Sequence, residues 1–244
     1  MSMPVISRTF DPAFLNRVAN DPAVRPSLGG EGELDLSELV SDPAGFALVT
    51  DEGGFVLQPR GPGHYEVHSL FLPGSAAVPT MRAAQEWMFT RTDCTSIWSK
   101  VPDSNKAAKG LARAGGLRSI FKRDDARLGD TSFVELNVMS WAMNNPALAK
   151  RGERFHNLLE KAKKERGSEL HVHPHDEAHE RAVGAAWLMI ENGQAAKGVG
   201  FYNLWAGVAG YQTIQLLSLA PVTVDAGDAV LGLGQNGVEV VLCR

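Results

Sequence analysis

Three short apolar segments separated by tight glycine turns constrain the fold of this chain more than any other feature. The segments are Phe46–Thr50, Phe55–Gln58 and His64–Leu72, and glycine-containing turns lie between them. Short strands joined by turns of this kind form an antiparallel meander. We therefore expect a sheet near the N-terminal end of the chain, preceded by a short helix at residues 10–19.

The hydrophobic period changes after the meander. Apolar residues recur at helical spacing from Ser75 onward, through Met81, Ala84 and Trp87. A helix that follows this one is expected to end at Gly115-Gly116, because glycine is favoured just past a helix terminus. The remaining elements of this half are a strand, that glycine-terminated helix and two last strands: Thr95–Val101, a helix capped by Asp103–Asn105 and running to about Ala114, Leu117–Arg123, and Ser132–Val138.

The C-terminal third has a different composition. Charge density rises from Pro146 to Arg166, where Phe155, Leu158, Leu159 and Ala162 recur at the spacing of an amphipathic helix. Two further helices are expected at residues 177–191 and 194–209. We therefore place a boundary near residues 139–150 and divide the chain into domains at residues 1–140 and 141–244.

The tail of the chain is expected to be β. Gln235-Asn236-Gly237 is a hairpin signal, since Asn-Gly favours the turns that join adjacent strands. The strands expected in the tail are Thr213–Leu219, Val222–Val224, Ala229–Leu233 and Val238–Cys243.

The order meander, helix, strand, helix, strand resembles the GNAT fold of the acetyl-CoA-dependent N-acetyltransferases. The stretch HYEVHSLFLPGSAAVPTMRAAQEWMF is similar to that family's central strand, acyl-CoA loop and following helix. The stretch TSIWSKVPDSNKAAKGLARAGGLRSIFKR is similar to its next strand and helix. The resemblance implies an α/β (α+β) fold, with a GNAT-like central mixed sheet, flanking helices, and a smaller C-terminal helical and β-hairpin domain. More narrowly, the whole chain resembles GNAT-like proteins of phage and prophage genomes.

The resemblance implies acetyl-CoA as cofactor, with its pyrophosphate bound by backbone N–H groups at the start of the helix after the central strand. That loop here holds one glycine and no Arg, Lys or Gln, and Pro79 lacks an N–H group. We therefore expect acetyl-CoA to bind weakly or not at all. The loop Gly74–Pro79 also fits the capped start of a helix, and Asn105 also fits the N-cap of the next helix. The predicted cofactor-binding residues are Ser75, Ala76, Ala77, Val78 and Asn105.

Acetyl transfer to an amine needs a base for the amine and an acid for the leaving thiolate. His64, Glu66 and His68 share one face of the third strand, because alternate residues of a strand point the same way. Glu66 and His68 are the candidate catalytic residues, although a solvated sheet face is the alternative. The resemblance implies a tyrosine as the acid, but no tyrosine occurs between Tyr65 and Tyr202, so that role is unfilled.

Four histidines cluster near residue 175, and imidazole is a good ligand for Zn or Ni. Pro174 disfavours a helix that would bring them onto one face, and the sequence has no second cluster of ligands. We therefore predict a polar loop and no metal at His171, His173, His175 and His179.

Charge and composition narrow the classes of partner. The net charge is -4 and the pI is about 6.0, which argues against nucleic-acid binding. No apolar run approaches the ~18–20 residues of a membrane-spanning helix, and Met1–Val5 does not fit a secretory signal. Cys94 and Cys243 form no CxxC pair. We expect the host cytoplasm or a virion as the location.

Two classes of function fit these observations. The loop without basic residues and the unfilled tyrosine role favour a non-catalytic structural or assembly component of a phage particle. The alternative is an acetyl-CoA-dependent N-acyltransferase. The aromatic residues Trp187, Tyr202, Trp205 and Tyr211 favour protein partners, because aromatics are enriched in interface cores. We expect a homo-oligomer or phage assembly proteins, and neither nucleic acid nor membrane.

Overall fold

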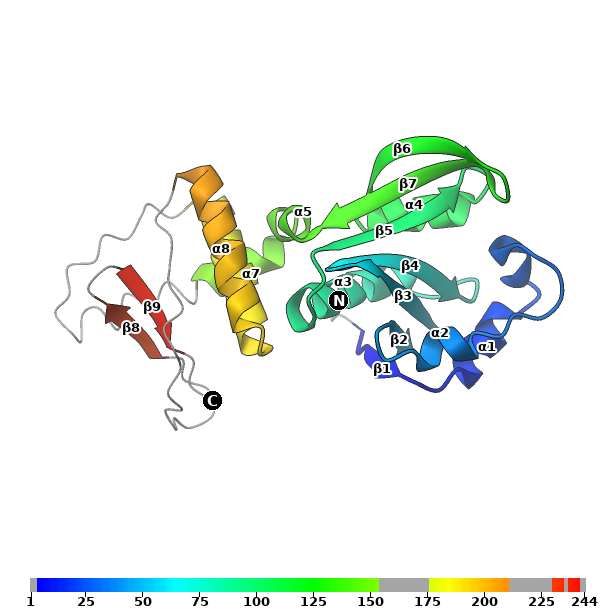
Figure 1. Ribbon diagram of the computed structural model, residues 1–244, viewed down its shortest axis with the longest axis horizontal. Helices are drawn as coiled ribbons and strands as arrows, with labels where there is room; N and C mark the ends of the chain where they lie inside the picture. The colour runs from blue at the N-terminus through cyan, green and yellow to red at the C-terminus, as the bar shows by residue number, and fades with distance from the viewer. Residues whose placement is uncertain (1–3, 154–175, 211–229, 235–236, 242–244) are drawn as a thin grey trace. The chain divides into compact units, whose positions relative to one another are not determined.

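The computed structural model describes residues 4–153, 176–210, 230–234 and 237–241 (Figure 1). Contacts within the chain divide it into two compact units. The first unit comprises Met1–Phe89 and Asp93–Val138, and the second comprises Thr90–Thr92 and Met139–Arg244.

The first unit is built on one sheet of seven strands, in the order β1-β2-β3-β4-β5-β7-β6. The pairing of β4 with β5 is parallel, and every other pair in this sheet is antiparallel. This mixed sheet with flanking helices confirms the fold class that the resemblance implies. In chain order the elements are β1 (Ser7–Thr9), α1 (Ala13–Ala19), a 3₁₀ turn (Arg25–Leu28), α2 (Ser37–Ser41), β2 (Phe46–Thr50), β3 (Gly53–Gly61), β4 (His64–Phe71), α3 (Ala77–Arg91), β5 (Ser96–Pro102), α4 (Lys106–Ala114), β6 (Arg118–Asp125) and β7 (Gly129–Asn137).

Helices cover the two faces of the sheet differently. Ala47, Val56 and Leu70 belong to a buried cluster that α1 and α2 complete, so we name their side of the sheet the α1 face. Phe46, the neighbour of Ala47, points the opposite way and packs edge-on against Trp87 of α3 at 5.4 Å between ring centroids. The opposite side is therefore the α3 face.

Helix α4 ends at the predicted glycine pair. Gly116 takes a φ of 81°, a conformation that side chains with a Cβ atom disfavour. The N–H of Leu117 returns to the carbonyl of Ala112 at 2.9 Å, as in a Schellman motif. Gln85 of α3 donates to the carbonyl of Gly115 at 2.7 Å, which fixes α4 beside α3. Helix α3, which follows β4, and helix α4, which follows β5, are therefore held next to each other.

The second unit contains α5 (Val138–Met143), a helical segment at residues 146–153, α7 (Glu177–Glu191) and α8 (Ala195–Ala209). A Cβ atom at Gly184 of α7 would lie 2.0 Å from the carbonyl oxygen of Leu148, so the two helices meet backbone to backbone. A Cβ atom at Gly198 of α8 would similarly lie 2.6 Å from the carbonyl oxygen of Ala186. Glycine at these crossings permits the close packing.

The predicted helices at 177–191 and 194–209 are confirmed by α7 and α8. The predicted tail hairpin corresponds to β8 (Val230–Gly234) and β9 (Gly237–Val241), which pair antiparallel. Residues 154–166 of the predicted long helix and the strands predicted at 213–219 and 222–224 lie outside the described residues.

Candidate active site

The parallel strands β4 and β5 pair over only three positions and then diverge. Their register joins His64 to Ser96, Tyr65 to Ile97 and Glu66 to Trp98, although β4 continues to Phe71 and β5 to Pro102 (Figure 1). The residues beyond the last pair flank a wedge, in which backbone donors and acceptors are not paired between the strands.

A side chain crosses the wedge near its apex. The hydroxyl of Ser99 on β5 donates to the carbonyl of Val67 on β4 at 2.9 Å. Both residues directly follow the last strand pair, so this bond satisfies an acceptor that the sheet ladder leaves open. Tyr65, one residue before the apex, is buried on the α3 face, and its hydroxyl donates to Asp93 at 2.7 Å.

Glu66 is buried between two cations. The Nε atom of Arg60 donates to its Oε2 at 2.7 Å, and Nζ of Lys100 lies 3.9 Å from its Oε1. Arg60 sits at a register shift of β3 between Pro59 and Gly61, where a bulge re-aims a side chain. Burial is tolerated because the carboxylate is paired. Of the two residues that sequence predicts as catalytic, Glu66 is thus already held in an ion pair.

The network continues from Arg60 to His68, the second predicted residue. Arg60 donates through Nη2 to Oε1 of Gln58 at 2.9 Å, and Nε2 of His68 lies 3.1 Å from the same oxygen. A guanidinium only donates, so it fixes which end of the Gln58 amide is oxygen. Nε2 of His68 must then carry the proton, which leaves the Nδ1 lone pair able to accept one.

The environment of His68 favours the neutral imidazole. The pKa of its imidazole is lowered, chiefly because the surrounding protein desolvates the cation, although the residue as a whole is exposed. The charge of Glu66 opposes this shift in the pKa, whereas the charges of Arg60 and Lys100 reinforce it. A neutral histidine with an accepting nitrogen has the protonation state of a general base.

The predicted pyrophosphate loop uses most of its amides internally. The N–H of Ser75 donates to Leu72, and that of Ala77 donates to the carbonyl of Ser75. The N–H of Ala76 donates to the carboxylate of Glu52 at 2.6 Å, from the turn between β2 and β3. Among the four predicted residues, only Val78 has an amide for which the described residues show no acceptor. An internal carboxylate thus occupies the start of α3, where a helix favours an anion.

Asn105 is the N-cap of α4. Its Oδ1 accepts from the N–H of Ala108 at 2.9 Å, so the cap alternative for this residue is present, and its role as a cofactor ligand stays a prediction. Asp103, two residues earlier, accepts from Lys109 and Lys122 at 2.9 and 2.8 Å. Its pKa is lowered by the hydrogen bonds from Lys122, Lys109 and Ser132, in that order.

Sequence reasoning missed Gln58, Arg60, Lys100 and Glu52. Gln58 and Arg60 alternate on β3 as polar residues after an apolar run, a signal available at period two. Lys100 likewise alternates with Trp98 on β5. Glu52 lies in a polar turn and gives no such signal.

Other predicted features fall outside this site. His179 is part of α7, while His171, His173 and His175 lie outside the described residues. The described residues hold no group of three or more His, Cys, Asp or Glu side chains able to bind a metal ion. Within the described ranges, no helix combines the length and apolar character needed to span a bilayer.

No protein-family model matches this chain, and no curated protein matches it. Solved structures resemble it in part. They include a spermidine N-acetyltransferase from Vibrio cholerae in complex with CoA and spermine, at 15% identity and a TM-score of 0.49, covering 58% of this chain and 99% of that chain. An acetyltransferase of the GNAT family from Bacillus anthracis has 16% identity and a TM-score of 0.45 over 54% of this chain and 93% of that chain.

The AAC(6')-Ib structure in complex with paromomycin and acetyl-CoA has 14% identity and a TM-score of 0.48, over 58% of this chain and 97% of that chain. Likenesses of this size say nothing about activity.

Proposed function

We propose that this chain is an acyl-CoA-dependent N-acyltransferase. The observation that carries the proposal is the wedge between β4 and β5, which opens directly after Glu66 and Trp98. Unpaired backbone groups at a parallel strand split are suited to bind an amide-bearing chain such as the pantetheine arm, as an extended peptide adds to a strand. His68 lies on β4 just past the last strand pair, at the rim of the wedge.

The chemistry assigned to this site is direct transfer. The acceptor's amine nitrogen attacks the thioester carbonyl carbon, a C–N bond forms, and the C–S bond breaks with its electron pair leaving on sulfur. Nδ1 of His68 takes the amine proton, and the thiolate takes a proton from water. Gln58 and Arg60 hold the imidazole in the required tautomer. A positioned base of this kind contributes about 10²–10⁴-fold to the rate.

Donor affinity is expected to come from the pantetheine arm rather than from the nucleotide. Ser75, Ala76 and Ala77 use their amides within the chain, so the start of α3 offers the pyrophosphate little. The loop also has no basic side chain to add charge. This proposed mode of binding is the opposite of a phosphate-anchored one.

The test is calorimetric titration of the full-length protein with acetyl-CoA, followed by measurement of thiol release with a panel of primary amines. We expect binding that is lost in Ser99→Phe, which fills the wedge, and thiol release that falls at least about 100-fold in His68→Ala. Phe10→Ala serves as the control, because Phe10 is exposed and lies beside the edge strand β1, and the substitution should change neither binding nor thiol release. Absence of acetyl-CoA binding at millimolar concentration contradicts the proposal.

A second candidate is a GNAT-fold module without catalysis. The engaged amide of Ala76 and the ion pair between Arg60 and Glu66 favour it, because both engage groups that the sequence interpretation assigns to cofactor binding and catalysis. This candidate predicts neither acetyl-CoA binding nor thiol release. No described residue favours a role in a phage particle, so that part of the sequence interpretation stays a prediction.

A further inference from the structure

Three aromatic rings form a stack on the α1 face of the sheet, beside the wedge. Phe133 of β7 lies between Phe121 of β6, at 4.3 Å and 17° between ring planes, and Trp98 of β5, at 6.3 Å and 14°. The strand register places all three on the same side as Glu66 and His68. We name Trp98, Phe133 and Phe121 the ring stack.

The ring stack reaches solvent although it is apolar. Phe121 is 50% exposed, and its neighbour Ile120, at a register shift of β6, is 56% exposed. Large apolar side chains that are exposed side by side mark binding surfaces, whereas single exposed ones do not. Because Trp98 pairs with Glu66 in the register, the ring stack begins one strand away from the catalytic candidates.

Cations outnumber carboxylates around the ring stack. Lys100 places Nζ 5.8 Å from the ring centroid of Trp98, and the register places Arg118 and Arg123 on the same face of β6. The carboxylates on this face beside the ring stack are those of Glu135 and Asp125. Each is already engaged by its own chain.

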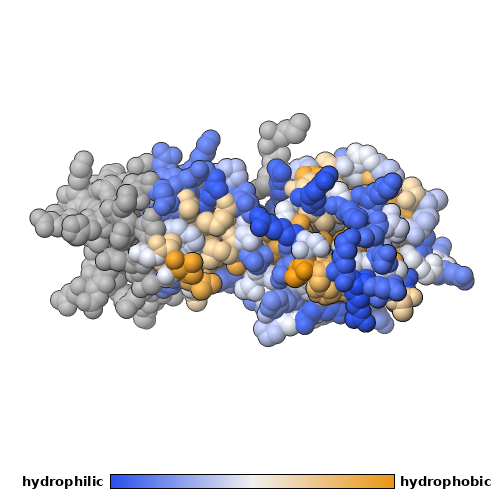
Figure 2. Space-filling model, turned by 90° about the horizontal axis from the view of Figure 1, so that it is seen from above, coloured by the Kyte–Doolittle hydropathy of each residue, from blue (hydrophilic) through white to orange (hydrophobic). Residues whose placement is uncertain are grey.

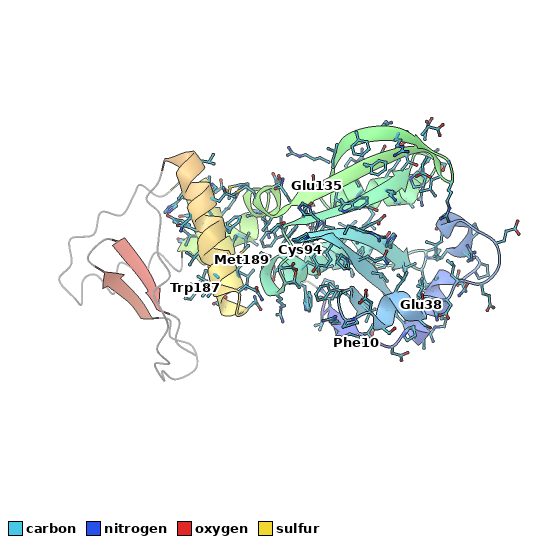
Figure 3. All side chains as sticks on the ribbon, viewed as in Figure 1. Phe10, Glu38, Cys94, Glu135, Trp187 and Met189 are labelled. Carbon is cyan, nitrogen blue, oxygen red and sulfur yellow. The ribbon has the colours of Figure 1, made fainter. Side chains whose placement is uncertain are left out.

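Glu135, labelled on β7 in Figure 3, accepts from the hydroxyl of Ser96. Asp125 accepts from the backbone of Arg127 and Leu128 at 2.9 and 3.2 Å. Glu66, on the neighbouring strand, is paired with Arg60. The hydrogen bonds to Glu135 and Asp125 come from neutral groups, so both carboxylates keep their charge. Besides the Arg60–Glu66 pair, this surface carries the three cations Lys100, Arg118 and Arg123 against the two carboxylates, although Lys100 also lies 3.9 Å from Glu66. The excess is one positive charge, which attracts an anion and repels a polycation.

We propose that the ring stack binds the acyl acceptor, and that this acceptor is a primary amine bearing an aromatic ring and a carboxylate. The ring of the ligand packs on the exposed ring stack, its carboxylate pairs with Lys100, and its amine reaches the rim of the wedge. The fate of the amine rests on the proposed acyltransferase function, whereas binding to the ring stack does not. The same charges disfavour polyamines as acceptors.

The experiment measures binding of three probes to the full-length protein, by calorimetry without any acyl donor. L-Tryptophan has the ring, the amine and the carboxylate, tryptamine lacks the carboxylate, and spermidine lacks the ring and the carboxylate. We expect tryptophan to bind better than tryptamine and spermidine not to bind. Phe121→Ala is expected to weaken tryptophan binding by about three- to tenfold, and Lys100→Gln to abolish the preference for tryptophan over tryptamine.

Phe10→Ala is the matched control. Phe10 is 53% exposed, close to the 50% of Phe121, but it lies next to β1 at the other edge of the sheet (Figure 3). Equal effects of Phe121→Ala and Phe10→Ala overturn the proposal, and so does tighter binding of spermidine than of tryptophan. Probe binding that depends on Phe121, without acyl transfer, supports this inference and counts against the proposed function. Acyl transfer to amines with KM values that Phe121→Ala does not change supports the proposed function and overturns this inference.

Discussion

The protonation state of His68 is set by residues on three strands. Gln58 fixes the tautomer, and desolvation lowers the pKa of the imidazole. The charge of Glu66 raises this pKa, while those of Arg60 and Lys100 lower it. A base on this face therefore stays unprotonated at a more acidic pH than an ordinary histidine, whose pKa is about 6.5.

This balance predicts the acid limb of the pH profile. Activity that needs neutral His68 falls as the pH drops through its pKa, so the acid limb of kcat/KM is expected below pH ~6.5. Glu66→Gln removes the interaction that raises the pKa and should move the acid limb to lower pH. Lys100→Gln removes one that lowers the pKa and should move the limb to higher pH. Shifts of the same sign in both variants contradict this assignment.

A carboxylate from the turn between β2 and β3 binds at the start of α3. Glu52 lies in the turn between β2 and β3, and β3 begins opposite the end of β4, so the turn reaches the loop before α3. Its carboxylate accepts from the N–H of Ala76 and interacts favourably with the helix dipole. The same donor is then not available to a phosphate unless the carboxylate moves away.

Replacement of Glu52 tests this competition. Wild-type protein is expected to bind S-acetyl-pantetheine and acetyl-CoA with affinities within about threefold, a difference below ~0.7 kcal/mol. Glu52→Ala removes the competing charge, so acetyl-CoA should then bind better while S-acetyl-pantetheine does not change. Asp51→Asn removes a neighbouring charge and is the control, because among the described residues it is Glu52, not Asp51, that bonds to Ala76. A marked preference of the wild type for acetyl-CoA shows that the loop binds phosphate as it stands.

Period and turn chemistry predicted most elements of the first unit. The β2, β4, β5, β6 and β7 strands and helices α1, α3 and α4 lie within a few residues of their predicted bounds. β1 and α2 were not predicted, because each is five residues or shorter and too brief to show a hydrophobic period. β3 begins and ends beyond Phe55–Gln58, since its first residues are the glycines Gly53 and Gly54, which sequence patterns assign to turns.

The site was harder to predict than the fold. Glu66 and His68 were found from alternation along one strand, which is local information. Their partners come from other strands, and which of these face each other depends on register and on the bulge at Arg60. The link from Glu52 to Ala76 joins positions 24 residues apart and follows only from the folded sheet edge.

Beyond the sheet, the second unit has surface properties of its own. Helix α8 is apolar on nearly its whole circumference, with Lys197 and Asn203 as its polar residues. It buries Phe201, Tyr202 and Trp205, whereas Leu204 and Val208 are 64% and 85% exposed. Figure 2 shows apolar surface on both units, interrupted by hydrophilic side chains. A helix that is apolar on two sides has more apolar surface than one neighbouring helix covers.

The whole chain is therefore predicted to self-associate through α8. Leu204 and Val208 are four residues apart and lie on one helix face, so two lysines there place charge in any contact that this face makes. Light scattering of the full-length protein should give a mass above one chain, and the double variant Leu204→Lys with Val208→Lys should give the mass of one chain. Val5→Lys changes a residue that is 90% exposed in the first unit and should leave the mass unchanged. A monomeric wild type at every concentration, or a double variant that still associates, rules out α8 as the interface and leaves the partner of the second unit to be sought on another face.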